Sequence, residues 1–130
     1  MREDVEWILG NCQVWAIVGL SGNPSRAAHG VAGFLQQRGK KIVPVHPSAQ
    51  TVHGEQGYAS LADIPFPVDV VDVFRRSQDA GQFADEAVAI GARAVWFQLG
   101  VVDDAAYART KAAGLRMVMD VCPAIEWRTG

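Results

Sequence analysis

Residues 13–34 read Q-V-W-A-I-V-G-L-S-G-N-P-S-R-A-A-H-G-V-A-G-F and predict the first elements of an α/β fold. The apolar run 14–18 predicts a strand that ends at Gly19, and a short loop of serine, glycine, asparagine and proline follows. After Arg26, apolar residues recur at the spacing of a helix. A strand, a small loop and a helix in this order seat a pyrophosphate on the helix N-terminus. Because the loop is not G-x-G-x-x-G, it leaves open which nucleotide would bind.

The rest of the chain continues this alternation of strand and helix. Short, nearly continuous apolar runs are typical of parallel strands that are buried on both faces. Such runs follow at 41–45, 68–74, 93–98 and 115–119. Helical patterns occupy 27–37, 79–90 and 103–113, with a weaker one at 3–9. The three longer patterns end near Gly39, Gly91 and Gly114, and glycine is common just past the end of a helix.

These elements predict one doubly wound α/β domain over residues 1–130, with a five-stranded parallel sheet and helices on both faces. We expect the strand order 3-2-1-4-5, and a helix within residues 1–12 packed on the domain. The connection at 47–67 differs from the others, because it is rich in proline and glycine and has one short apolar piece at 60–64. We expect it to be a long loop with one short helix that crosses the sheet edge.

Composition limits the classes of partner. The formal net charge of -2 provides no basic field for nucleic acid. No apolar run reaches the roughly 18–20 residues that span a bilayer, and the first residues carry acids where a signal peptide would be basic and apolar. The two cysteines, Cys12 and Cys122, lie far apart, so a disulfide framework is not expected. We therefore expect a cytoplasmic protein with a small-molecule partner, and the sequence leaves a homo-oligomer open.

The ligand of such a sheet lies beyond the carboxyl ends of the strands, where the strand order reverses. In the expected order this point falls between the first and fourth strands. Five segments should converge there, namely 19–26, 46–47, 74–76, 98–100 and 120–122. In the first of them, glycines permit close backbone approach and polar side chains offer hydrogen bonds. Arg26 is suited to pair with phosphate oxygens, although any strand-to-helix turn favours the loop residues around it.

The ends of the other strands help to choose the ligand. A protein that binds NAD has an acid after its second strand to hold the ribose hydroxyls, whereas this chain has His46 and Pro47. Phe74, Arg75 and Arg76 are suited to border an adenine and its phosphates, or they are a buried phenylalanine beside a pair of surface arginines. Gln98 ends a buried strand with an amide, and the glycine two residues later leaves room beside it.

Catalytic and metal chemistry find little support in the sequence. The loop G-L-S-G-N at 19–23 lacks the last glycine of a nucleophile elbow, and no histidine follows His53 to complete a triad. The histidines and cysteines lack metal-ligand spacing, so we assign no metal and no catalytic residue. Asp72 lies within an apolar run, so its carboxylate should find hydrogen-bond donors, and nearby loop N–H groups are the obvious ones.

Six segments in order resemble a known family. They are V-G-L-S-G-N-P-S-R at 18–26, I-V-P-V-H-P at 42–47, Y-A-S-L-A-D-I-P at 58–65, V-D-V-V-D-V-F-R-R at 68–76, V-W-F-Q-L-G at 95–100 and M-D-V-C-P-A-I-E at 119–126. Together they resemble the small stand-alone coenzyme A-binding proteins. The Rossmann-like domain of these proteins is similar to the CoA-binding domain of the succinyl-CoA synthetase alpha subunit.

The resemblance implies a pocket for the nucleotide end of coenzyme A (CoA) or of an acyl-CoA. The residues implied to face the diphosphate are Gly19, Leu20, Ser21, Pro24, Ser25 and Arg26. Those implied to line the adenosine are Val45, His46 and Pro47. Val73, Phe74 and Arg75 would flank the adenine or the pantetheine entrance, and Gln98 with Gly100 would form the far wall.

Three functions remain open. The first is non-catalytic binding of CoA or acyl-CoA, with a sensing or regulatory role. The second is a nucleotide-dependent enzyme, either an NAD-type oxidoreductase or a CoA ligase or transferase subunit that needs a partner. The third is an interaction domain with a vestigial pocket. Cys122 is expected either to be a small buried residue or to form a mixed disulfide with the CoA thiol.

Overall fold

The computed structural model describes residues 1–129 and contains one five-stranded sheet. All strand pairs are parallel, as the apolar runs predicted. The strands are β1 (Val14–Val18), β2 (Lys41–Val45), β3 (Val70–Val73), β4 (Ala94–Phe97) and β5 (Arg116–Val118). The predicted fold class is therefore confirmed.

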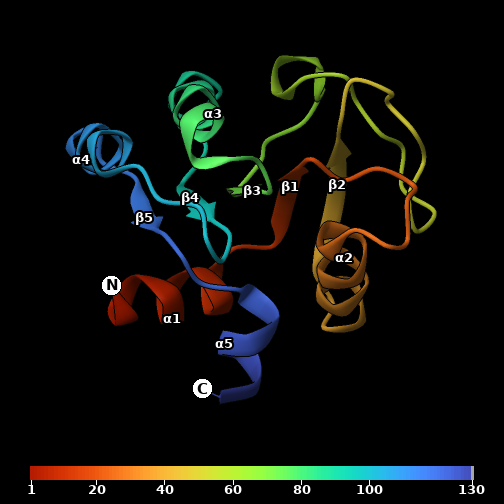
Figure 1. Cartoon of the computed structure of the whole chain (residues 1–130), viewed down its shortest axis with the longest axis horizontal. Helices are drawn as coiled ribbons and strands as arrows, with labels where there is room; N and C mark the ends of the chain where they lie inside the picture. Colours follow the sequence, from red (N-terminus) through yellow and green to blue (C-terminus); the bar gives the residue numbers. More distant parts are fainter. Residues whose placement is uncertain (130) are drawn as a thin grey trace.

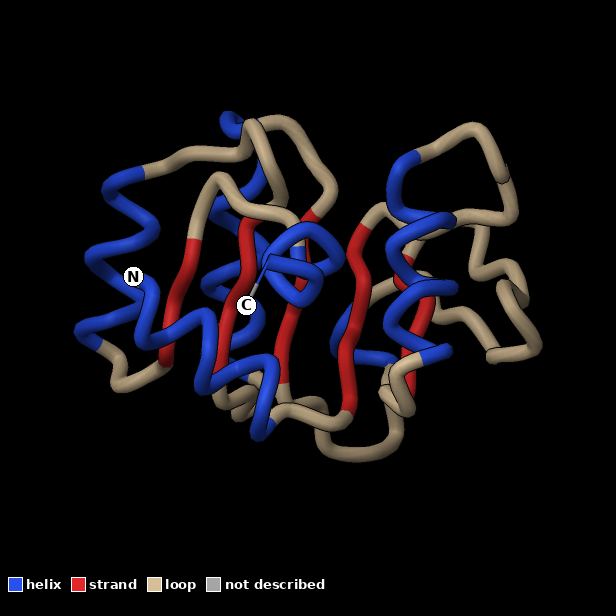
Figure 2. The backbone as a smooth tube through the Cα atoms, turned by 90° about the horizontal axis from the view of Figure 1, so that it is seen from below, coloured by secondary structure: helices blue, strands red, loops and turns tan. Residues whose placement is uncertain are grey.

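Helices cover both faces of the sheet, so the molecule has three layers (Figure 1). The elements on one face are α1 (Arg2–Asn11), α2 (Ala27–Gln37) and α5 (Pro123–Thr129). Those on the other face are the short 3-10 helix η1 (Leu61–Asp63), α3 (Ser77–Ala89) and α4 (Asp104–Ala112). Figure 2, seen from the side of α1, α2 and α5, shows the five strands side by side behind these helices. No helix among residues 1–129 is long and apolar enough to cross a membrane.

The strand order differs from the expected 3-2-1-4-5. The observed order is β2-β1-β3-β4-β5, so the third strand pairs with the first instead of lying outside the second. The reason is the face on which the connection between β2 and β3 crosses. Its helix η1 packs beside α3, on the face opposite α2, and Leu61 is buried there. When right-handed connections change face, their direction along the sheet reverses, so this connection passes β1.

The edge strand β2 is partly covered by its own downstream connection. Tyr58 donates its backbone N–H to the carbonyl oxygen of Pro44 at 2.9 Å, and His46 donates its own to the carbonyl oxygen of Tyr58 at 3.1 Å. A bridge between Val45 and Tyr58 runs parallel to the strand. The carboxyl end of β2 is thus held by residues that follow it in the sequence.

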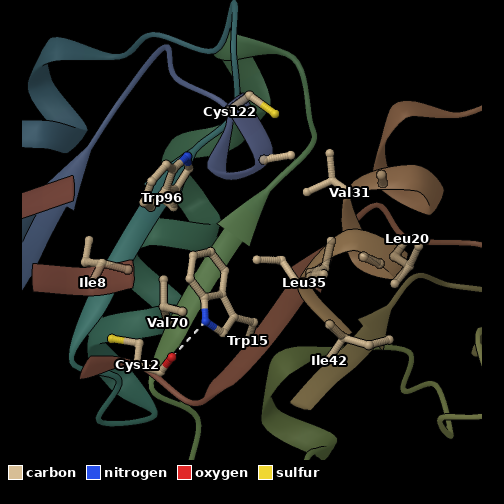
Figure 3. Packing of buried hydrophobic residues seen from close by; sticks show 14 of the residues in the cluster. Ile8, Cys12, Trp15, Leu20, Val31, Leu35, Ile42, Val70, Trp96 and Cys122 are labelled. Atoms are coloured by element: carbon tan, nitrogen blue, oxygen red, sulfur yellow. Dashed lines mark hydrogen bonds between the residues drawn. The ribbon is translucent and has the colours of Figure 1, made fainter. Parts of the chain in front are cut away.

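Two apolar clusters pack on the two faces of the sheet. Alternate residues of β1 belong to different clusters, as the strand period requires: Trp15 faces α1, α2 and α5, whereas Ala16 faces α3 and α4. The rings of Trp15 and Trp96 lie 5.6 Å apart between their centroids. Figure 3 shows Trp15 in this cluster, with its Nε1–H donating to the carbonyl oxygen of Cys12 at 3.0 Å.

The N-terminal helix is attached by a buried carboxylate. Asp4 is 8% exposed and accepts hydrogen bonds from Lys111 Nζ at 2.6 Å and from Arg116 Nη1 at 3.1 Å. Burial raises the pKa of Asp4, but the hydrogen bonds and charges of these two cations outweigh it, so that the pKa lies below its ordinary value. Because both cations come from the C-terminal part of the chain, this cluster joins the first helix to α4 and β5.

Candidate functional site

A cleft of about 700 Å³ lies at the carboxyl ends of four strands. Because β1 and β3 are neighbours and their connections leave in opposite directions, the reversal of strand order falls between them. The sequence placed this reversal between the first and fourth strands. That expectation was wrong, because β3 and not β4 pairs with β1. The residues that line the cleft are Gly19, Ser21, Asn23, Arg26, Ala27, Ala28, His46, Phe74, Arg75, Arg76, Asp79, Gln98, Leu99 and Val101.

The first wall of the cleft is the loop between β1 and α2. Gly19 has a φ of 97°, and a Cβ there would lie 2.7 Å from the carbonyl oxygen of Phe74, so the position requires glycine. The side chain of Asn23 organises the rest of the loop, because its Oδ1 accepts from the N–H and the hydroxyl of Ser25 at 3.0 and 2.7 Å. Asn23 N–H in turn donates to Ser21 Oγ at 3.3 Å. The loop is therefore shaped by its own polar side chains.

The N-terminus of α2 faces this cleft without a side-chain cap. The N-cap residue, Arg26, makes no capping hydrogen bond. Within residues 1–129, the backbone N–H groups of Ala27 and Ala28 have no hydrogen-bond acceptor, and both residues line the cleft. Free N–H groups and the positive end of the helix dipole favour an anion at this position.

Arginines add full positive charges to this partial charge. Three of them line the cleft, and Arg76 pairs with Asp79 at 2.9 Å. Arg26 and Arg75 have no carboxylate within 4.0 Å in the described part of the chain. Two guanidiniums without carboxylate partners beside a free helix N-terminus form a site for an anion with more than one negative charge.

His46 follows β2 and contributes a neutral polar group. Its Nδ1 accepts the backbone N–H of Ser48 at 3.1 Å and lies 2.8 Å from the hydroxyl of Ser48. This leaves the proton of the neutral ring on Nε2. Burial, and then the charge of Arg75, lower the pKa of His46 below its ordinary value. At pH 7 the ring is therefore a neutral hydrogen-bond donor at the edge of the cleft.

Gln98 and Leu99 form the far side of the cleft, at the end of β4. Gln98 is 8% exposed, and its Oε1 is buried with no hydrogen-bond partner in residues 1–129. Leu99, the next residue, is 59% exposed. This side thus has one buried acceptor without a donor and one exposed apolar side chain.

Half of the residues proposed from the resemblance line the cleft: Gly19, Ser21, Arg26, His46, Phe74, Arg75 and Gln98. The others lie beside it. The side chains buried in the core or sheet are Leu20, Val45 and Val73. The exposed residues of neighbouring loops are Pro24, Ser25, Pro47 and Gly100. The segment 120–122 was also expected to converge here, but none of its residues lines the cleft; Asp120 Oδ1 accepts the N–H of Gly100 at 2.7 Å and so contacts the loop after β4. Cys122 is 8% exposed, within the core cluster (Figure 3).

Some features of the site have no clear signal in the sequence. Ala27 and Ala28 act through backbone N–H groups, which their side chains do not indicate. Gln50 is part of no recognisable motif. Its Oε1 nevertheless accepts the N–H of Gly22 at 2.9 Å, so a residue 28 positions away in the sequence holds the loop. Arg76 belongs to the expected segment 74–76, whereas Asp79 was expected only as the start of a helix, where an acid in the first turn is typical.

The carboxylate of Asp72 does not find the loop donors that were expected for it. It is fully buried, and neither oxygen has a hydrogen-bond partner in the described residues. The donors go to Asp69 instead, whose Oδ2 accepts the N–H groups of Gln13 and Val14 at 2.9 and 2.8 Å. Asp69 lies before the first residue of β3, where it meets the chain entering β1, whereas Asp72 lies within the strand. Desolvation raises the pKa of Asp72 well above its ordinary value.

The chain is similar to known proteins along almost its whole length. Residues 13–128 match the protein family described as CoA binding domain. The uncharacterised protein YneT of Bacillus subtilis (strain 168) is 36% identical over 121 residues, which cover 93% of this chain and 90% of that protein. A hypothetical protein from Pyrococcus horikoshii OT3 is 32% identical, with a TM-score of 0.92 over 99% of this chain and 91% of that chain.

A more distant likeness involves a larger protein. Acetyl-coenzyme A synthetase 1 of Ca. Korarchaeum cryptofilum, described as dinucleotide forming, has a TM-score of 0.78 at 22% identity. The match covers 88% of this chain and 27% of that chain, and at this identity it shows a shared fold. The family match and the identity to YneT extend over nearly the whole chain, and from them it follows that this protein belongs to the CoA binding domain family.

Proposed function

We propose that this protein binds coenzyme A or an acyl-CoA in the cleft at the carboxyl ends of its strands, without catalysing a reaction, in a sensing or regulatory role. The observation that carries the proposal is one arrangement of charge. Arg26 and Arg75 lack carboxylate partners among residues 1–129, and the free N–H groups of Ala27 and Ala28 lie in the same cleft. CoA carries a diphosphate and a 3′-phosphate, so its nucleotide end has the charge that these groups require.

The residues around this charge fit the remaining parts of the ligand. The diphosphate would lie on the N-terminus of α2 beside Arg26. The adenosine would lie between His46 and Phe74, with the Nε2–H of His46 as a donor. The pantetheine arm would leave along Gln98 and Leu99. The cleft lining also contains Ser21, His46 and Asp79, and in support of the non-catalytic part none of these three side chains bonds to another within residues 1–129; the hydroxyl beside His46 is that of Ser48, which is outside the lining.

The alternative is a nucleotide-dependent enzyme. An NAD-type oxidoreductase is disfavoured by His46 and Pro47, which follow β2 where an acid would hold the ribose hydroxyls. A CoA ligase or transferase subunit would need a partner chain, and the fold shared with part of an acetyl-coenzyme A synthetase favours this form of the alternative. Turnover of an acyl-CoA by the isolated protein would overturn the non-catalytic proposal.

Isothermal titration with CoA, acetyl-CoA, NAD and ATP tests the choice of ligand. We expect CoA and acetyl-CoA to bind more tightly than NAD and ATP. Binding of NAD with no binding of CoA would overturn the proposal, and no binding of any of the four would favour a vestigial pocket.

Arginine variants test the site. Arg26→Ala and Arg75→Ala should each weaken CoA binding by about 1.5–3 kcal/mol, which is the range for a hydrogen bond to a charged group. Arg109→Ala is the matched control, because Arg109 is an exposed arginine that pairs with Asp85 at 3.2 Å outside the cleft. An affinity that is unchanged in both cleft variants would remove the arginines from the site.

A further inference from the structure

Asp72 is a carboxyl group in the centre of the sheet without a visible structural role. It lies in β3 between β1 and β4, and its register partners are Ile17 and Trp96, both fully buried. Neither of its oxygens has a hydrogen-bond donor in residues 1–129. Burial of a polar group without a partner destabilises a protein, so such a group in a native fold calls for another reason.

The position of Asp72 relates it to the cleft. Phe74, which lines the cleft, lies directly after the last residue of β3 and packs against the cluster that contains Ile17 and Trp96, so it lies on the same face of the sheet as Asp72. Two residues along a strand span roughly 6.5 Å, so Asp72 lies one layer beneath the cleft floor. On this face α2 provides Ala28, which belongs both to the cleft lining and to the core cluster that contains Ile17 and Trp96.

Gln98, the residue directly after β4, lies next to Phe74 and Asp72 on the adjacent strand's side. Its backbone N–H donates to the carbonyl oxygen of Val73 at 3.2 Å, and it lies two residues beyond Trp96, so it shares the sheet face of Asp72. Gln98 is among the residues that line the cleft, and its Oε1, which is buried, also lacks a donor. Three buried oxygen atoms without donors thus lie on this face of the sheet, one in a residue that lines the cleft and two in the residue beneath it.

We propose that Asp72 and Gln98 form an inner polar subsite that positions an amide group of the ligand, with Gln98 in direct contact and Asp72 acting through one water molecule. Oε1 of Gln98 would accept the amide N–H, and the bridging water would bond to the carboxyl of Asp72. This inference rests on the proposed function, because the pantetheine arm of CoA carries two amide groups. The nucleotide 3′,5′-ADP shares the phosphates and adenosine of CoA but lacks this arm.

The test compares the affinities of CoA and 3′,5′-ADP in matched variants. Asp72→Val, which removes the polar group, should weaken CoA binding about tenfold, the equivalent of one hydrogen bond. It should leave 3′,5′-ADP binding unchanged within about twofold, since this ligand does not reach the subsite. Asp72→Asn keeps the shape and a hydrogen-bonding group, so its CoA affinity should stay near that of the wild type. Asp69→Asn is the control, because Asp69 lies at the opposite end of the strand.

Gln98→Met gives an independent variant at the cleft surface and carries the test where Asp72→Val does not fold. It should also weaken CoA selectively, and the two changes together should weaken it less than the sum of their effects. Equal CoA affinity in the wild type, Asp72→Val and Gln98→Met would overturn this inference but not the proposed function. Equal weakening of CoA and 3′,5′-ADP binding in the variants would do the same. If the wild type binds neither 3′,5′-ADP nor CoA, that result would instead overturn the proposed function on which the inference rests.

Discussion

Replacing Asp72 by asparagine removes a buried proton-binding group while the shape of the side chain is nearly unchanged. In the native protein, desolvation raises the pKa of this carboxyl well above its ordinary value of 3.8. In the unfolded chain the carboxyl is in water and ionises near that ordinary value. Between these two pKa values the native state keeps a proton that the unfolded state has lost.

The size of the effect follows from this single proton. The contribution of Asp72 to the free energy of unfolding is fully present below the pKa of the carboxyl in the unfolded chain. It is lost as the pH rises through the higher pKa of the carboxyl in the native state. Within that window, the free energy of unfolding falls by up to about 1.4 kcal/mol per pH unit. Asparagine binds no such proton, so the Asp72→Asn variant should gain stability relative to the wild type by this amount per unit.

Urea denaturation at pH 4.5, 5.5 and 6.5 measures the difference. The slopes of unfolding free energy against urea should be the same in both proteins, so that the midpoints report stability. Asp72→Val also lacks the proton and should give the same dependence on pH, which separates the charge effect from any effect of the amide. A stability difference that does not change with pH would refute the reasoning, because it would mean that Asp72 ionises in the native state.

Three further predictions concern other parts of the fold. Gly19→Ala should destabilise the protein by about 1–3 kcal/mol, because alanine is strained at positive φ and its Cβ would meet the carbonyl oxygen of Phe74; an unchanged thermal midpoint would contradict this. Asp4→Asn should cost about 1–3 kcal/mol in urea denaturation through its bonds to Lys111 and Arg116. Since the pKa of Asp4 is lowered, the stability it adds should disappear as the pH falls below its ordinary 3.8. Titrations of CoA at rising NaCl should show weakening affinity, and a flat response would argue against a charged site.

The sequence predicted those parts of the fold that depend on local patterns. Apolar runs located the five strands, and the glycines at 39, 91 and 114 follow their helices with φ values of 85°, 78° and 92°. The strand order was wrong because it depends on the face chosen by the connection after β2. That choice is made by the burial of Leu61 beside α3, a long-range contact with no local pattern.

For the site, the sequence located the strand ends but not the groups that act between them. The convergence of Arg26, His46 and Arg75 in one cleft follows from the parallel sheet, which brings carboxyl ends together. The free N–H groups of α2 could not be read from alanine side chains. The sequence also could not show that backbone N–H groups bond to Asp69 and not to Asp72, because this depends on where β3 begins relative to β1.

The covering of β2 by residue 58 also has a consequence for assembly. An edge strand normally exposes N–H and carbonyl groups that recruit a strand from another chain. On this edge the outward carbonyl of Pro44 is already bonded to Tyr58, and proline has no N–H to offer beside it. A second copy therefore has no ladder to extend at this end of β2. Growth of the sheet from molecule to molecule is blocked there by the same chain segment that carries the polypeptide across to β3.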